Sequence, residues 1–135
     1  MAYLSYLQNQ MYWYNIFDIS NMKKNDSLNQ ISVILKTISH PSRLAILLAI
    51  GEGEVCVCHL EKMLGMSQSH ISQQLMILRE VGIVLPRRDY RYIHYKLVYP
   101  KLLGLIGGIA GIYGIALPEF HAPNNCDCSK CSKNK

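Results

Sequence analysis

The sequence predicts a mainly α-helical fold with one small β-hairpin, and two patterns predict it. Between residues 28 and 80 apolar side chains recur at helical spacing, and Gly or Pro stands where that spacing breaks. Two short runs rich in aromatic and β-branched residues then flank Asp89 and Tyr90, as expected for a pair of strands. The chain has 135 residues, of which 50% are hydrophobic and 17% charged, so it can bury one core and gains from a partner subunit.

Three regions are expected along the chain. Residues 1–26 form an N-terminal extension with an extra helix over residues 3–17, which packs on the core or on a second copy. Stacking on nucleic acid is the alternative, disfavoured because this helix has no Lys or Arg. The extension lacks the basic and continuous apolar segments of a signal peptide. Residues 27–117 form the central domain, and residues 118–135 form a flexible tail that contains cysteines.

The central domain is predicted to begin with two helices. The first covers residues 28–39 and ends before His40 and Pro41, because proline disfavours helical backbone in the residue before it. Pro41 suits the first turn of the second helix, over residues 42–50, whose nearly continuous apolar character predicts deep burial. His40 at this junction is expected to cap or pack rather than to bind a metal.

A helix-turn-helix is predicted next. One helix runs from about residue 56 to residue 64, with Gly65 as its stop, and Ser67 caps another that runs to about residue 80. The outer face of this second helix carries polar side chains that can reach base edges in the major groove of double-stranded DNA. A solvated polar face without a partner is the alternative. The predicted base contacts are Gln68, Ser69, Ser72 and Gln73.

The strand pair, over residues 83–88 and 91–98, carries a dense group of basic and aromatic side chains. A basic hairpin after a helix-turn-helix is typical of a wing that contacts phosphates and the minor groove. Arg88 and Arg91 are the predicted phosphate contacts. The formal net charge of +5 also favours an anionic partner, although charge alone is a weak argument.

A charge-free run at residues 102–117 predicts a last, buried helix. The run is shorter than the roughly 20 apolar residues that a membrane span needs, so no membrane partner is expected. Two overlapping GxxxG spacings, of Gly104 with Gly108 and of Gly107 with Gly111, permit two helices to approach closely. They predict the seam of a homodimer.

The five cysteines fall into two clusters, Cys56-x-Cys58 and Cys126-x-Cys128-x2-Cys131. Such crowding suits thiolates around one ion better than disulfides between distant segments, and it predicts a reduced, cytoplasmic location. Thiolates select soft ions, here Cd(II), Pb(II), Zn(II) or Cu(I), and by the same property trivalent arsenic, As(III).

Cys56 and Cys58 do not complete a coordination sphere, so the tail is predicted to supply the remaining thiolates. One tail cysteine gives a trigonal site suited to As(III) or Pb(II), and two give a tetrahedral site suited to Cd(II) or Zn(II). A separate site in the tail is the alternative, as is a purely structural role for Cys56 and Cys58. His59 is expected to be a partly exposed helix residue rather than a ligand.

With these elements placed, the middle of the chain resembles the ArsR/SmtB family of metal-responsive winged-helix repressors. The motifs that carry the resemblance are HPSRLAILLAI, EVCVCHL, LGMSQSHISQQLMILREVGIV and RRDYRYIHYKL, in this order between residues 40 and 97. The resemblance implies a winged helix-turn-helix homodimer that represses an operator until an inducer binds. It also implies that Cys56 and Cys58 match the cysteines of the family's ELCVCDL metal box.

Three features depart from the family pattern. His59 stands where the metal box has Asp, and Tyr90 replaces the glycine common at the wing tip. The last helix lacks the His and carboxylate ligands with which some members bind zinc, so that site is not expected here.

The sequence therefore predicts a metal- or metalloid-responsive transcriptional repressor that leaves its operator when a thiophilic ion binds; no organic cofactor is expected. A thiol redox-sensing repressor is the first alternative, and a metal-sequestering or membrane-associated protein is a more distant one. An enzyme is not expected, because no Ser/His/Asp set, phosphate-cradling loop or carboxylate pair stands out. His70 and Ser69, although adjacent, are expected to face DNA or solvent.

Overall fold

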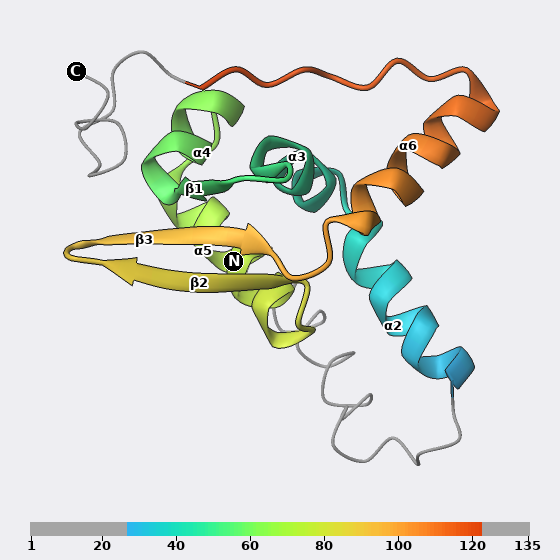
Figure 1. Cartoon of the computed structure of the whole chain (residues 1–135), viewed down its shortest axis with the longest axis horizontal. Helices are drawn as coiled ribbons and strands as arrows, with labels where there is room; N and C mark the ends of the chain where they lie inside the picture. Colours follow the sequence, from blue (N-terminus) through green and yellow to red (C-terminus); the bar gives the residue numbers. More distant parts are fainter. Residues whose placement is uncertain (1–26, 123–135) are drawn as a thin grey trace, which may run out of the picture. The chain divides into compact units, whose positions relative to one another are not determined.

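The computed structural model of the chain describes residues 27–122 (Figure 1). The chain divides into two compact units, residues 1–36 and residues 37–135, and each is described by itself. The extra helix predicted at residues 3–17 lies outside the described residues. So do the three tail cysteines, Cys126, Cys128 and Cys131.

Helix α2, Ser27–Ile38, begins in the first unit and confirms the helix predicted at residues 28–39. Of its residues, Thr37 and Ile38 at the end are the buried ones. Most of its apolar stripe is therefore exposed in a single copy of the chain. The exposed apolar side chains are Leu28, Ile31, Ile34 and Leu35.

Helix α3, Pro41–Ile50, forms the centre of the core in the second unit. His40 is its N-cap, and the Nδ1 atom of that ring accepts a hydrogen bond from the Ser42 N–H at 3.2 Å. The predicted capping role of His40 is therefore confirmed. Ile46 and Leu47 are fully buried, because the helix packs against two other helices and a strand.

A short strand that the sequence did not predict, β1 (Glu54–Cys56), precedes the helix-turn-helix. Helix α4, Val57–Leu64, therefore begins slightly later than predicted, with Cys56 as its N-cap. Gly65 ends α4 in the left-handed conformation, with φ of 63°, as its predicted role as a stop requires. Three residues are too few to show the alternation by which strands are detected in a sequence.

The second helix of the helix-turn-helix, α5 (Gln68–Glu80), has the predicted bounds. Ser67 caps it, because the Ser67 Oγ atom accepts a hydrogen bond from the His70 N–H at 3.3 Å. The inward stripe of this helix is fully buried and consists of Ile71, Leu75 and Leu78.

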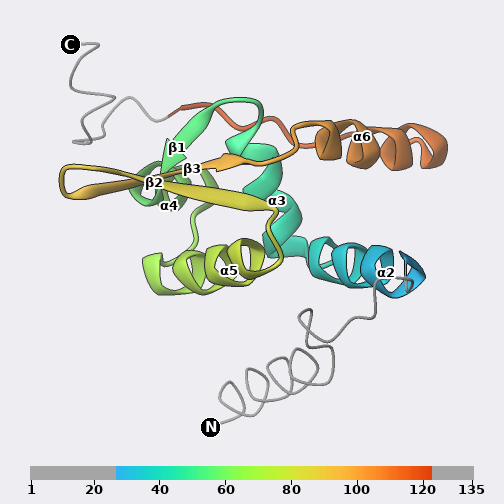
Figure 2. The same cartoon turned by 60° about the horizontal axis from the view of Figure 1, so that its bottom comes forward.

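Strands β2 (Val84–Asp89) and β3 (Tyr92–Leu97) form the predicted hairpin. β1 pairs with the free edge of β3, so the sheet is antiparallel and three-stranded, in the order β1-β3-β2. Tyr90 in the turn has φ of 57°, the left-handed conformation that favours glycine. The hairpin projects beyond the helices of its unit in both Figure 1 and Figure 2.

The last helix, α6 (Lys101–Tyr113), is shorter and less buried than predicted. Gly114, with φ of 63°, ends it before the apolar run itself ends. Ile106 and Ala110 are buried, whereas Ile112 and Tyr113 are 80% and 75% exposed. No single helix in the described part of the chain is long and apolar enough to cross a membrane, and α2 and α3 meet that test only when counted together.

A buried arginine joins two helices of the core. Arg43 of α3 is 4% exposed, and its Nη1 atom donates to the Oε1 atom of Gln74 in α5 at 2.9 Å. The Nε atom of Arg43 also donates to the Thr37 carbonyl oxygen. These bonds satisfy a charge that is costly to bury without partners, and they fix the orientation of α5 against α3.

The pKa of His40 lies below its ordinary value of 6.5, because burial disfavours the charged ring and Arg43 and His70 add to the effect. The unfolded chain therefore binds this proton more readily, so the stability contribution is complete above about pH 6.5 and falls as the pH drops toward the folded-state pKa. We expect urea denaturation to show a lower free energy of unfolding at about pH 5.5 than at about pH 7.5. His40→Asn keeps a cap acceptor that does not titrate, so it should lose less stability over this interval; equal losses would contradict this role.

Replacing the buried amide of Gln74 tests the polar link between α3 and α5. Gln74→Met keeps the side-chain volume but removes the oxygen that accepts from Arg43. We expect a loss of about 2 kcal/mol in the free energy of unfolding, because a buried charged donor loses an acceptor. Gln68→Met, at an exposed position of the same helix, is the matched control and should change stability by less than about 0.5 kcal/mol. Equal effects of the two substitutions would show that the link does not stabilise the fold.

Candidate metal centre and nucleic-acid interface

Three potential metal ligands gather where β1 passes into α4. Cys56 is the last residue of β1 and the N-cap of α4, and Cys58 and His59 lie in the first turn of that helix. The backbone of Cys56 is extended, with φ of −87° and ψ of 164°, and the helix begins at the next residue. This abrupt change from strand to helix brings the three side chains together.

The Sγ atoms of Cys56 and Cys58 are 2.6 Å apart, and the Nδ1 atom of His59 lies 2.9 Å from the Cys56 Sγ atom. All three ligand atoms lie within 4.8 Å of one another, and neither thiol is in a disulfide. His59 is only 6% exposed, so the expectation that it is a partly exposed helix residue is wrong. Its position three residues after Cys56 is the signal that could have shown this, because that spacing is close to one helical turn.

This set of side chains suits a cation that accepts both sulfur and nitrogen. Zinc binds thiolate sulfur at about 2.3 Å and imidazole nitrogen at about 2.0–2.1 Å, in tetrahedral sites that mix the two. Two thiolates and one imidazole leave one tetrahedral position for a further donor. The N-terminus of α4 also favours the thiolate form of a nearby cysteine. Over residues 27–122, no other group of three His, Cys, Asp or Glu side chains is arranged to hold an ion.

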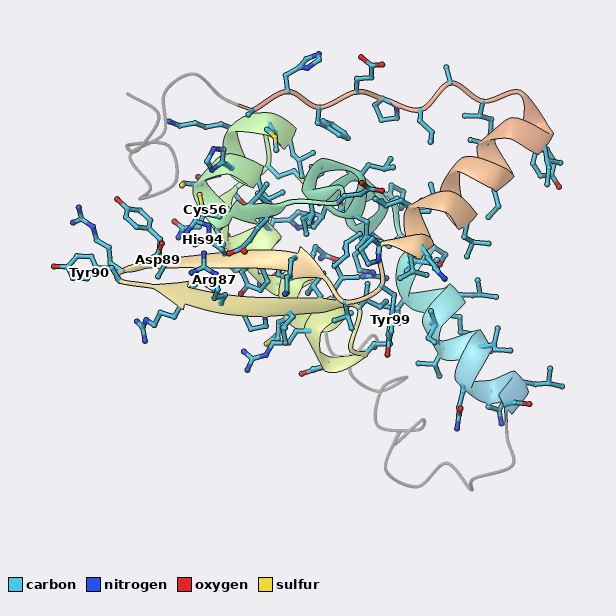
Figure 3. The ribbon with its side chains drawn as sticks, in the orientation of Figure 1. Cys56, Arg87, Asp89, Tyr90, His94 and Tyr99 are labelled. Carbon is cyan, nitrogen blue, oxygen red and sulfur yellow. The ribbon has the colours of Figure 1, made fainter. Side chains whose placement is uncertain are left out.

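Residues of the wing border this cluster. Tyr92, at the start of β3, packs against Cys56. His94 is fully buried and pairs with Cys56 across the β1–β3 ladder, and its Nε2 atom lies 4.0 Å from the Oδ2 atom of Asp89. Figure 3 shows Cys56, His94 and Asp89 close together beside the hairpin. The sequence did not predict this proximity, because it depends on the unpredicted strand β1.

The predicted base contacts lie in the first half of α5. Gln68, Ser69 and Ser72 are exposed there, whereas Gln73 is partly buried. The helix therefore presents three small polar side chains to solvent near an end whose backbone N–H groups favour anions.

His70 does not belong to that exposed surface. Its Nε2 atom lies 3.0 Å from the Oγ atom of Ser42 in α3, and the contact is partly buried. The expectation that His70 faces DNA or solvent is therefore corrected: this side chain joins the N-terminal end of α5 to the N-terminal end of α3.

The arginines of the wing differ in their surroundings. Arg88 and Arg91, the predicted phosphate contacts, are both exposed. Arg87 forms a salt bridge with Glu54 of β1, with its Nη2 atom 2.7 Å from the Glu54 Oε1 atom. The Cζ atom of Arg91 lies 5.4 Å from the centroid of the Tyr92 ring, which is a cation–π contact.

The sequence matches the family described as bacterial regulatory protein, arsR family, over residues 40–85. It is 41% identical over 85 residues to the biofilm growth-associated repressor of Xylella fastidiosa. The matched region covers 63% of this chain and 75% of that protein. It is 42% identical over 65 residues to the arsenical resistance operon repressor of Escherichia coli. The matched region covers 47% of this chain and 56% of that protein.

Solved structures with a similar fold include proteins of the same group. The crystal structure of the transcriptional repressor BigR from Xylella fastidiosa superposes with a TM-score of 0.59 at 39% identity, over 68% of this chain and 97% of that one. The relatives are transcriptional regulators that bind DNA, not enzymes. The chain therefore belongs to the ArsR family of bacterial regulatory proteins, as a transcriptional repressor with a winged helix-turn-helix fold.

Proposed function

We propose that this repressor senses a thiophilic ion: it holds operator DNA as a homodimer and releases it when the ion binds Cys56, Cys58 and His59. The observation that supports this most is the buried cluster of two sulfur atoms and one imidazole nitrogen at the start of α4. Helix α4 leads through the turn at Gly65 into α5, so a change at the cluster lies one short helix away from the DNA-reading surface.

The ligand set favours Zn(II) or Cd(II). Both accept a mixture of thiolate and imidazole in tetrahedral geometry. As(III) and Pb(II) suit three thiolates, so they would need a further thiolate from the tail, which carries Cys126, Cys128 and Cys131. The relative from Escherichia coli is a repressor of an arsenical resistance operon, so both classes of ion belong in the test.

DNA is read by α5 and held by the wing in this proposal. Exposed hydroxyl and amide groups at the start of a helix can bond to base edges in the major groove. Arg88 and Arg91 of the wing neutralise phosphates of the DNA backbone. The residues of α5 assigned to the bases are Gln68, Ser69, Ser72 and Gln73.

The homodimer forms through α6 in this proposal. Four apolar side chains of this helix are exposed in a single chain: Leu105, Ile109, Ile112 and Tyr113. A Cβ atom added at any of its four glycines would meet nothing within 4 Å, so the helix leaves open space beside its backbone. A second copy of α6 would cover both features. We also propose a cytoplasmic location, since operator binding and reduced thiols both require such a compartment.

Ion binding would act by changing the arrangement of the dimer. If the start of α4 shifts, the two copies of α5 no longer match successive major grooves. Such coupling between two sites is reciprocal and is typically about 1–3 kcal/mol, so operator DNA must weaken ion binding by the same factor as the ion weakens DNA binding.

A thiol redox sensor is the second candidate, favoured by the separation of 2.6 Å between the Cys56 and Cys58 sulfur atoms. Two thiols this close can oxidise together or react in turn with peroxide. The candidates differ in one respect: ion binding reverses with a chelator, whereas oxidation reverses with a reductant.

The proposal predicts an ion-dependent loss of operator affinity. With a duplex selected from a random pool, under reducing conditions, Zn(II) or Cd(II) should weaken DNA binding by the wild type about 5- to 150-fold, as measured by fluorescence anisotropy. Cys56→Ser should bind DNA normally and lose this response. Unchanged DNA affinity of the wild type on adding each ion would overturn the proposal, and a response to peroxide alone would favour the redox sensor.

Replacing Cys126, Cys128 and Cys131 together by Ser is the control for the tail in the same assay. If the tail supplies a thiolate, the response to As(III) should disappear in this variant. The response to Zn(II) should persist, because His59 remains in place. Loss of both responses would mean that the tail completes the site for every ion.

The wing proposal predicts different effects for two neighbouring arginines. Arg88→Gln should reduce the slope of log affinity against log salt by about one for each protomer, because one phosphate contact is lost. Arg87→Gln should change that slope less, because Glu54 already neutralises Arg87. An unchanged slope in Arg88→Gln would show that Arg88 makes no phosphate contact.

A further inference from the structure

The wing touches the thiol cluster directly. The Tyr92 side chain packs against Cys56, and so does Cys58. The guanidinium of Arg91 lies over the same ring, with Cζ at 5.4 Å from the centroid. One aromatic ring thus contacts both a residue of the thiol cluster and an exposed basic group of the wing.

The backbone of Cys56 is held by its pairing with β3 in the sheet. Cys56 pairs with His94 on β3, and His94 pairs with Arg87 on β2, so these three residues form one row across all three strands. Cys56 is 1% exposed and His94 is fully buried. Close packing of this kind leaves no room into which Cys56 could retreat.

The salt bridge between Arg87 and Glu54 strengthens this anchorage. Glu54 is the first residue of β1, and its Oε1 atom lies 2.7 Å from Arg87 on the far strand of the sheet. Figure 3 shows Arg87 beside the hairpin and Tyr90 at its tip. β1 is therefore tied to the sheet by its ladder to β3 and by an ion pair that spans β3.

An ion bound by both thiolates fixes the separation of their sulfur atoms. The two sulfur atoms are 2.6 Å apart in this structure. Around an ion with metal–sulfur bonds of about 2.3 Å and tetrahedral angles, they stand about 3.8 Å apart. Because the backbone of Cys56 is held by the sheet, room for the ion must be made on the side of Cys58 and of the Tyr92 ring, which packs against Cys56.

We propose that Tyr92 is the positioning residue that links the thiol cluster to the wing: ion binding displaces its ring, and Arg91 moves with it away from its phosphate. This inference rests on the proposed ion sensing at Cys56 and Cys58 and adds a second route to the change in the dimer. Tyr92 is not a ligand in it. The wing loses one phosphate contact per protomer when the ion binds.

The experiment measures operator affinity as a function of salt, with and without Cd(II), for the wild type, Tyr92→Phe and Tyr92→Leu. In the wild type, Cd(II) should lower the slope of log affinity against log salt by about two for the dimer, one for each Arg91. Tyr92→Phe keeps the ring and should behave similarly. Tyr92→Leu should still bind Cd(II), seen as thiolate charge-transfer absorption, but should lose the change in slope.

Arg91→Gln is a second variant at an exposed position, where misfolding is not expected. Without Cd(II) it should already have the lower slope, and Cd(II) should not lower it further. Arg88→Gln is the matched control: its slope is lower without the ion and should still fall by about two when Cd(II) is added.

The outcomes separate the two proposals. A wild type whose DNA binding does not respond to Cd(II) overturns both the proposed sensing and the role of Tyr92. A wild type that responds, together with full changes in slope in Tyr92→Leu and Arg91→Gln, overturns the role of Tyr92 alone. Loss of the change in slope in Arg91→Gln but not in Arg88→Gln supports it.

Discussion

The abrupt passage from strand to helix at Cys56 is the constraint on which the functional surfaces of this protein depend. As the end of β1, Cys56 is held in the ladder to β3 and therefore to the wing. As the N-cap of α4, it also begins the helix-turn-helix. No loop separates the strand from the helix, and the Cys56 side chain at the junction is buried. The thiols, the wing and the helix-turn-helix therefore meet at one residue.

The apolar core buries one face of α5, and polar contacts fix the orientation of this helix. Burial of one stripe of α5 decides which face of that helix is exposed, but apolar packing is not directional. Two polar links to α3 supply direction: Arg43 with Gln74 near the middle of α5, and Ser42 with His70 near its start. Together they restrict how α5 can turn or slide. The exposed face of α5, which is the proposed DNA-reading surface, is therefore aligned by buried and partly buried contacts with α3.

Much of this fold could be predicted from periodicity and caps. Ser67 and Gly65 mark the ends of the helix-turn-helix in the sequence as they do in the structure. Prediction from the sequence failed where tertiary contacts determine the local structure. β1 forms because β3 lies beside it, and its three residues carry no pattern of their own. The burial of His59 was missed for the same reason, since that strand sets the start of α4. The last helix was predicted too long, because an apolar run does not show that Gly114 takes a left-handed conformation.

The ladder between β1 and β3 also orders the steps by which the protein is made. β1, α4 and α5 are all synthesised before β3. Until then Cys56 has no neighbouring strand, and closing the intervening loop costs entropy that only the completed hairpin can offset. A nascent chain consequently has its two thiols but not the packed environment around them. The cluster of Cys56, Cys58 and His59 therefore gains its packed surroundings only when the hairpin has formed.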